Sequence, residues 1–158
     1  ESVIGYPSQL DRAVVISIIQ SLWDATDTNT WSTLSNGLEG RIDPFEMLYI
    51  GSIGDLQISN ISTSRALRNA DASILSSSSI LPYGMPVIDG GEGATGNIGV
   101  YFDGGFSHAP VENLLGQEPH PAHNWVAGVE AAHSMAFGYL YDGFVEDRCE
   151  GSCIYDAN

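Results

Sequence analysis

The chain of 158 residues is the length of one domain, and its 43% hydrophobic residues exclude full disorder. Its 20 acidic residues oppose five basic ones, all arginine, and the net charge of −15 excludes nucleic-acid binding through phosphate contacts. It equally excludes docking on anionic lipid through a basic segment. No apolar run reaches the roughly 20 residues that a membrane-spanning helix needs. No basic segment followed by an apolar stretch opens the chain, so we expect any targeting peptide to be absent or already removed.

The beginning of the chain predicts two helical segments. Apolar residues recur at helical spacing over residues 10–24, and Ser8 has the side chain of an N-cap for this helix. Residues 31–38 predict a second, shorter helical turn that ends at glycine. The polar residues between the two segments indicate a loop.

The middle of the chain predicts a helix start, a strand and another helix. Asp43-Pro44 is typical of a helix start, so we expect a helical segment over residues 45–48. Residues 49–62 separate isoleucines by Gly, Ser and Asp and predict a strand. Residues 64–75 place Ala, Leu and Ile on one side of a helix.

The remainder predicts two strands and a long helix. The strands are expected over residues 85–88 and 100–102, with a Gly-rich loop between them, and the helix over residues 122–145. Helices that alternate with short strands favour an α/β fold. We therefore expect a short-stranded sheet flanked by helices, with a long C-terminal helix.

Two copies of the tripeptide Asp-Gly-Gly follow predicted strands, at residues 89–91 and 103–105. A carboxylate at the C-terminal end of a strand lies where α/β proteins bind ligands, and it can orient or deprotonate a hydroxyl nucleophile. Gly104 and Gly105 would let the backbone approach a substrate closely, as loop or oxyanion residues. Because Asp-Gly-Gly is also an ordinary turn signal, the role of Asp103 depends on its surroundings.

The residues on both sides of Asp103 form a longer pattern. Residues 72–87 are a Ser-rich stretch that leads through Leu-Pro-Tyr-Gly into Met-Pro-Val, and residues 99–115 read Gly-Val-Tyr-Phe-Asp-Gly-Gly-Phe-Ser-His-Ala-Pro-Val-Glu-Asn-Leu-Leu. This pattern resembles the C-terminal half of a patatin-like acyl hydrolase. That family has a Ser/Ala-rich helix, a Pro-Val strand and a Tyr-x-Asp-Gly-Gly strand end followed by Pro-Val or Pro-Leu. With Asp43-Pro44 included, the resemblance spans residues 43–115.

The resemblance implies an α/β fold that hydrolyses acyl esters of lipids with a Ser–Asp dyad, and Asp103 matches the dyad aspartate. The chain contains no Gly-x-Ser-x-Gly nucleophile elbow and no Gly-rich oxyanion loop before a first helix. Since Asp103 alone cannot transfer an acyl group, the hypothesis requires a serine or threonine hydroxyl beside it. Residues 1–158 are expected to be a single domain, either complete or completed by a preceding segment or a second chain.

The histidines are a second candidate site, because all four lie within residues 108–133. Glu130 and His133 would share one face of a helix, and His120 and His123 stand where that helix begins. These four side chains could bind zinc or copper. The alternative is that the histidines cap or cover the helix and that the protein has no cofactor.

Cys149 and Cys153 are separated by Glu-Gly-Ser, which allows a small disulfide loop, although two reduced thiols fit the same spacing. A disulfide is typical of an oxidising compartment. Asn60 begins the triplet Asn-Ile-Ser, a candidate glycosylation acceptor. Together with the acidic composition, these features predict a secreted, extracellular protein.

Three functions follow from these observations. The first is a hydrolase of lipid degradation that acts on an acyl-lipid or ester substrate, with Asp103 supplied by this chain. The second is a non-enzymatic secreted protein that binds a partner or assembles with itself as a homo-oligomer, as the missing nucleophile would allow. The third is a metal-binding protein that uses the histidine cluster.

Overall fold

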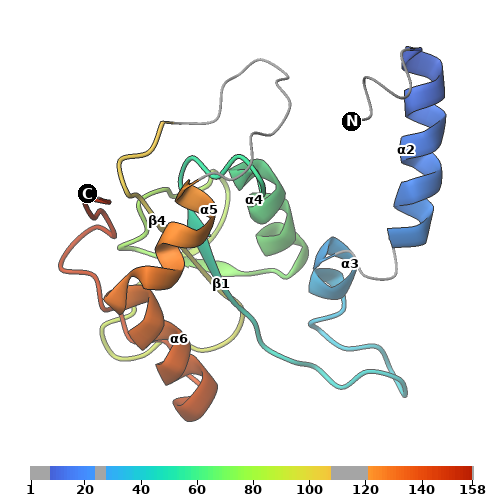
Figure 1. The fold of residues 1–158 in the computed structure, drawn as a ribbon. Coiled ribbons are helices and arrows are strands. Elements are labelled where there is room, and N and C mark those ends of the chain that lie inside the picture. Colours follow the sequence, from blue (N-terminus) through green and yellow to red (C-terminus); the bar gives the residue numbers. More distant parts are fainter. Residues whose placement is uncertain (1–7, 24–27, 108–120, 158) are drawn as a thin grey trace.

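A four-stranded parallel sheet forms the centre of the molecule in the computed structural model, which describes residues 8–23, 28–107 and 121–157 (Figure 1). The sheet has the strand order β1-β4-β2-β3. Its strands are β1 (Leu48–Ser52), β2 (Ser73–Leu75), β3 (Val87–Ile88) and β4 (Ile98–Phe102). The predicted α/β fold is confirmed.

Strand β4 is central because it pairs with β1 on one side and with β2 on the other. All five of its residues are buried, as expected for a strand covered on both faces. Gly99 in this strand has a packing role: a Cβ built there would lie 2.6 Å from a side-chain carbon of Leu67. The close approach of helix α4 (Asn60–Asn69) to the sheet therefore depends on that glycine.

Helices cover the two faces of the sheet (Figure 1). Leu67 of α4 packs with Ile74 and Tyr101 in a buried cluster on one face. Met135 of helix α6 (Glu130–Asp142) packs with Phe102 in a larger cluster on the other face. The short helix α5 (Pro121–Trp125) and the 3-10 turn η2 (Val126–Gly128) precede α6.

The first helix, α2 (Gln9–Trp23), begins where the sequence predicts, and the Ser8 side chain accepts a hydrogen bond from the backbone N–H of Asp11. Its apolar stripe is exposed: Leu10, Val14 and Ile18 keep 72%, 51% and 57% of their surface accessible. Helix α3 (Thr28–Thr33) begins inside the predicted loop, three residues before the helical turn predicted over residues 31–38, and ends at Thr33. In Figure 1, α2 stands apart from the sheet.

Several predicted helices and strands differ from the structure where a tertiary contact overrides a local signal. Residues 45–48 are not helical, since Met47 already pairs its backbone with Asn97 and Ile98 at the start of the sheet. The strand predicted over 49–62 ends at Ser52, and residues 60–62 already belong to helix α4. The helix predicted over 64–75 therefore begins earlier, at Asn60, and ends at Asn69, while residues 73–75 form β2, where burial in the sheet is available.

The long C-terminal helix predicted over residues 122–145 is interrupted. Gly128 ends η2, and Val129 has an extended backbone with φ −81° and ψ 121° before α6 begins. Val129 is buried in the core, so packing holds the chain in the non-helical conformation that turns α6 away from α5. None of the helices in the described ranges combines the length and the apolar character that crossing a bilayer requires.

Candidate functional site

The candidate site lies at the edge of the sheet where the parallel strands end. Ser52, the last residue of β1, stands opposite Phe102, the last residue of β4. The loops that follow these two strands are therefore neighbours, and each carries an aspartate, Asp55 and Asp103. Ligands of open α/β sheets bind outside this edge.

Asp103 directly follows the central strand, as the sequence predicts, and its carboxylate is partly exposed. Its Oδ1 accepts a hydrogen bond of 2.8 Å from the backbone N–H of Gly105. Gly105 has φ +74°, a conformation that favours glycine. The Gly105 N–H is thus occupied by the carboxylate and does not point to a separate oxyanion position.

The C-terminal tail holds the backbone of Asp103 with two hydrogen bonds. The Asp103 N–H donates to the carbonyl of Cys153, and the Tyr155 N–H donates to the carbonyl of Asp103, at 2.9 and 2.8 Å. Cys149 and Cys153 form a disulfide, which decides the alternative that the sequence left open. The Cys153 N–H in turn donates to the carbonyl of Ser77, so the cross-linked tail bridges Asp103 and the Ser-rich loop after β2.

Gly104 and the side chains above it give the Asp103 loop a second support. A Cβ at Gly104 would lie 2.6 Å from the Phe106 ring and 2.9 Å from the Trp125 ring. These two rings meet edge to face with their centroids 5.5 Å apart. The loop after β4 is therefore packed against α5, and only glycine fits at position 104.

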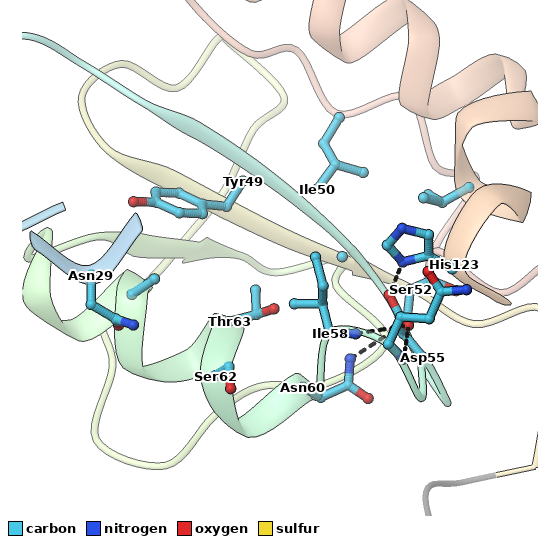
Figure 2. A pocket seen from close by; sticks show the side chains of 14 residues that line it. Asn29, Tyr49, Ile50, Ser52, Asp55, Ile58, Asn60, Ser62, Thr63 and His123 are labelled. Carbon is cyan, nitrogen blue, oxygen red and sulfur yellow. Dashed lines mark hydrogen bonds and ion pairs between the residues drawn. The ribbon is translucent and has the colours of Figure 1, made fainter. Parts of the chain in front are cut away.

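Asp55 and His123 form the closest acid–base pair at this edge (Figure 2). Asp55 Oδ2 lies 2.9 Å from His123 Nδ1, and the Asp55 and His123 side chains are 10% and 30% exposed. Asp55 Oδ1 also accepts the backbone N–H groups of Gln57 and Ile58. Burial raises the pKa of Asp55, but the hydrogen bonds from His123, Ile58 and Gln57 outweigh it, and the net pKa is below its ordinary value.

A cavity of about 700 Å³ opens beside this pair, along the outer edge of β1 (Figure 2). Strand β1 is the last strand of the sheet on this side, and the cavity walls come from β1, α3, α4, α5, η2 and the loop after β1. The apolar part of the wall and its polar groups are supplied by Ile50, Ile58, Ala66, Val126, Ser52, Asp55, Asn60 and His123. The arrangement suits a ligand with an apolar body and one polar group.

Ser52 adds a feature that needs an explanation. The residue lines the cavity and is 4% exposed, and its buried Oγ has no hydrogen-bond partner among the described residues. A buried hydroxyl left unpaired costs about 1–3 kcal/mol. Such a cost is typical of sites where a ligand or an ordered water completes the hydrogen bonding.

Asn60, predicted as a glycosylation acceptor, has its side chain engaged in the protein. Its Nδ2 donates to the carbonyl of Ser52 at 2.7 Å, and its Oδ1 accepts the backbone N–H of Gly54. The amide nitrogen that a glycan would modify therefore holds the end of β1 to the start of α4.

The predicted metal ligands are not gathered in the part of the chain that the structure describes. His123 is paired with Asp55, while Glu130 and His133 are exposed on α6, beyond the break at Val129. His120 lies outside the described residues. The one cluster of three ligand-type side chains in the described ranges is Asp147, Cys149 and Cys153, whose two sulfur atoms are already joined. Zinc or copper binding stays a prediction.

The sequence gives no local signal for the Asp55–His123 pair or its cavity. The two residues are 68 positions apart. Asp55 lies in the segment predicted to be a strand, and His123 belongs to the predicted set of metal ligands. The position of Asp55 after an apolar strand could have drawn attention to it, because carboxylates there lie at the ligand-binding edge.

Comparison of the chain with family models, with curated proteins and with solved structures found no match. Function must therefore be proposed from the geometry of this edge and from the residues that carry the resemblance.

Proposed function

We propose that the protein takes part in the hydrolysis of acyl esters, with lipid esters as the substrate class and Asp103 as the carboxylate of a Ser–Asp dyad. The observation that carries the proposal is the position of Asp103: a partly exposed carboxylate at the C-terminal end of a fully buried central strand. The tail and the Phe106–Trp125 pair hold it in place from two sides. A carboxylate so held can accept the proton of a hydroxyl nucleophile.

The proposal also has to say where the serine nucleophile comes from. In the described residues, the hydrogen bond to the Asp103 carboxylate comes from the Gly105 N–H and not from a hydroxyl. The proposal therefore assigns the serine to a segment or chain that adds to this edge. The Cys149–Cys153 disulfide supports a site of action in an oxidising, extracellular compartment.

The test is hydrolysis of a short-chain 4-nitrophenyl ester by the full-length natural protein and its Asp103→Asn and Asp103→Ala variants. Loss of a catalytic base typically lowers the rate by about 100-fold or more, and we expect that loss in both variants. Asp89→Asn is the matched control, because Asp89 Oδ1 accepts the Gly91 N–H at 2.9 Å, the same hydrogen bond that Asp103 makes with Gly105. Equal rates in wild type and the Asp103 variants would overturn the proposal.

A fluorophosphonate probe tests the serine separately. Its phosphorus forms a bond to the activated Oγ and fluoride leaves, so mass spectrometry of the labelled peptide identifies the nucleophile. We expect labelling in wild type and in Asp89→Asn, and at least tenfold slower labelling in Asp103→Asn. Absence of any labelled serine in the wild-type protein would contradict the dyad.

The apolar stripe of α2 favours a second candidate function, self-assembly without catalysis. Exposed Leu10, Val14 and Ile18 lie on successive turns of one helix, and large exposed apolar patches mark interaction surfaces. We expect sedimentation to show oligomers for wild type and monomers for a Val14→Asp/Ile18→Asp variant. Gln9→Glu, an exposed change on the opposite side of the same helix, is the control. A wild-type monomer at high concentration would remove this candidate.

A further inference from the structure

The cavity beside β1 holds an acid–base pair that the proposed Ser–Asp dyad does not use. Asp55 accepts backbone N–H groups on one oxygen and faces His123 Nδ1 with the other. An ionised carboxylate only accepts hydrogen bonds, so Nδ1 of the neutral imidazole carries the hydrogen. The lone pair is left on Nε2, which Figure 2 shows on the side of the ring away from Asp55.

An imidazole oriented in this way is the usual form of a general base. It takes a proton from a hydroxyl that comes within hydrogen-bond reach of Nε2, and the carboxylate behind it stabilises the imidazolium that results. His123 is partly exposed and lines the cavity, so a water or ligand hydroxyl has access to the ring.

Two further features of the cavity indicate the kind of ligand. Ile50, Ile58 and Val126 offer apolar wall, which suits a short hydrocarbon chain. The buried Ser52 hydroxyl has no partner among the described residues and can donate to a carbonyl oxygen. A donor, a base and an apolar wall around one space are complementary to an ester of a short apolar acid.

We propose that His123 is the general base of a hydrolytic site for such esters, with water as the nucleophile, Asp55 orienting the imidazole and Ser52 donating to the carbonyl oxygen. Nε2 takes a proton from water as the water oxygen bonds to the carbonyl carbon. The bond from that carbon to the alcohol oxygen then breaks, and the proton passes from Nε2 to the leaving oxygen. One ester and one water become one carboxylic acid and one alcohol.

This site differs from the Asp103 dyad in its residues and in its nucleophile. It uses the end of β1, the loop after β1 and helix α5 rather than the loop after β4. It needs no serine from another segment. Its failure is therefore separable from failure of the dyad: variants of His123 test one site and variants of Asp103 the other.

The first experiment measures hydrolysis of 4-nitrophenyl butyrate in the Asp103→Asn background, where the dyad no longer contributes, alone and combined with His123→Asn or His133→Asn. His133 is an exposed histidine of α6 and serves as the matched control. Relative to Asp103→Asn, we expect a loss of about 100-fold or more on adding His123→Asn and no change on adding His133→Asn. An unchanged rate on adding His123→Asn, or no hydrolysis above buffer by Asp103→Asn itself, would overturn the proposal.

The second experiment probes Nε2 directly and does not depend on turnover. 2-Bromoacetophenone alkylates an imidazole nitrogen: the nitrogen bonds to the methylene carbon and bromide leaves. We expect mass spectrometry to show at least threefold faster modification of His123 than of His133, with protection by butyrate. Modification of His123 at the same rate as His133, or slower, would show that the cavity neither admits such a ligand nor activates the ring.

A Ser52→Ala variant tests the assigned donor. Because the substitution removes a buried hydroxyl with no described partner, the variant is expected to fold, and thermal unfolding checks this. In the Asp103→Asn background we expect its rate on 4-nitrophenyl butyrate to fall about tenfold or more while alkylation of His123 is unchanged. An unchanged rate would remove Ser52 from the site.

Discussion

The two Asp-Gly-Gly copies share one side-chain hydrogen bond and differ in their surroundings. In both, the aspartate Oδ1 accepts the N–H of the second glycine, at 2.9 Å for Asp89 and 2.8 Å for Asp103. Asp89 is exposed and follows β3, a two-residue strand at the margin of the sheet, whereas Asp103 follows the buried central strand. Each tripeptide forms a turn. The position in the sheet of the strand before it determines whether that turn lies at the candidate site.

The largest expected effect on stability comes from substituting Gly104, the first glycine of the second copy. In Gly104→Ala the new Cβ would overlap the Phe106 and Trp125 rings, and such overpacking costs up to about 3 kcal/mol of unfolding free energy. Urea unfolding measures it. Gly91→Ala is the control: the nearest atom to its Cβ is a carboxylate oxygen at 3.3 Å, and its φ is not positive. There we expect a change below about 0.5 kcal/mol.

Similar destabilisation by the two glycine substitutions would contradict the structure of the Asp103 loop. It would mean that α5 does not pack on Gly104, and the support proposed for Asp103 would be lost. A change in Gly104→Ala alone would show that α5 packs closely on the loop after β4, whereas position 91 has room for a Cβ.

Asp55 is a third aspartate at the same edge of the sheet as Asp103. Among the described residues, its carboxylate contacts a histidine and two backbone N–H groups, which neither Asp-Gly-Gly aspartate does. Its folded pKa is below its unfolded value, so its contribution to stability is present above the unfolded pKa and is lost as pH falls through the folded pKa. We expect Asp55→Asn to cost about 1 kcal/mol at pH 7, and the difference from wild type to shrink below about pH 4.

Unfolding in urea at pH 7, 5 and 3 measures this smaller effect. Asp89→Asn is again the control, since Asp89 is exposed and accepts a single hydrogen bond within its own turn. A difference between wild type and Asp55→Asn that stays constant down to pH 3 would contradict the lowered pKa of Asp55.

Much of the fold could be predicted, because most of its signals are local. The N-cap Ser8, the apolar strand before Asp103 and the helical spacing of α6 each depend on residues close in the chain. Prediction failed where a distant segment competes: residues 45–48 pair with the sheet instead of forming a helix, and Val129 packs in the core and interrupts the predicted long helix.

The candidate site divides in the same way. Asp103, its two glycines and the spacing of Cys149 and Cys153 are visible in the sequence, because a turn or a small loop needs only neighbouring residues. The partnership of Asp55 with His123 and the cavity beside β1 depend on α5 returning to the end of a strand far away in the chain. Side-chain pairing at that distance is set by how helices and strands pack, which no local pattern records.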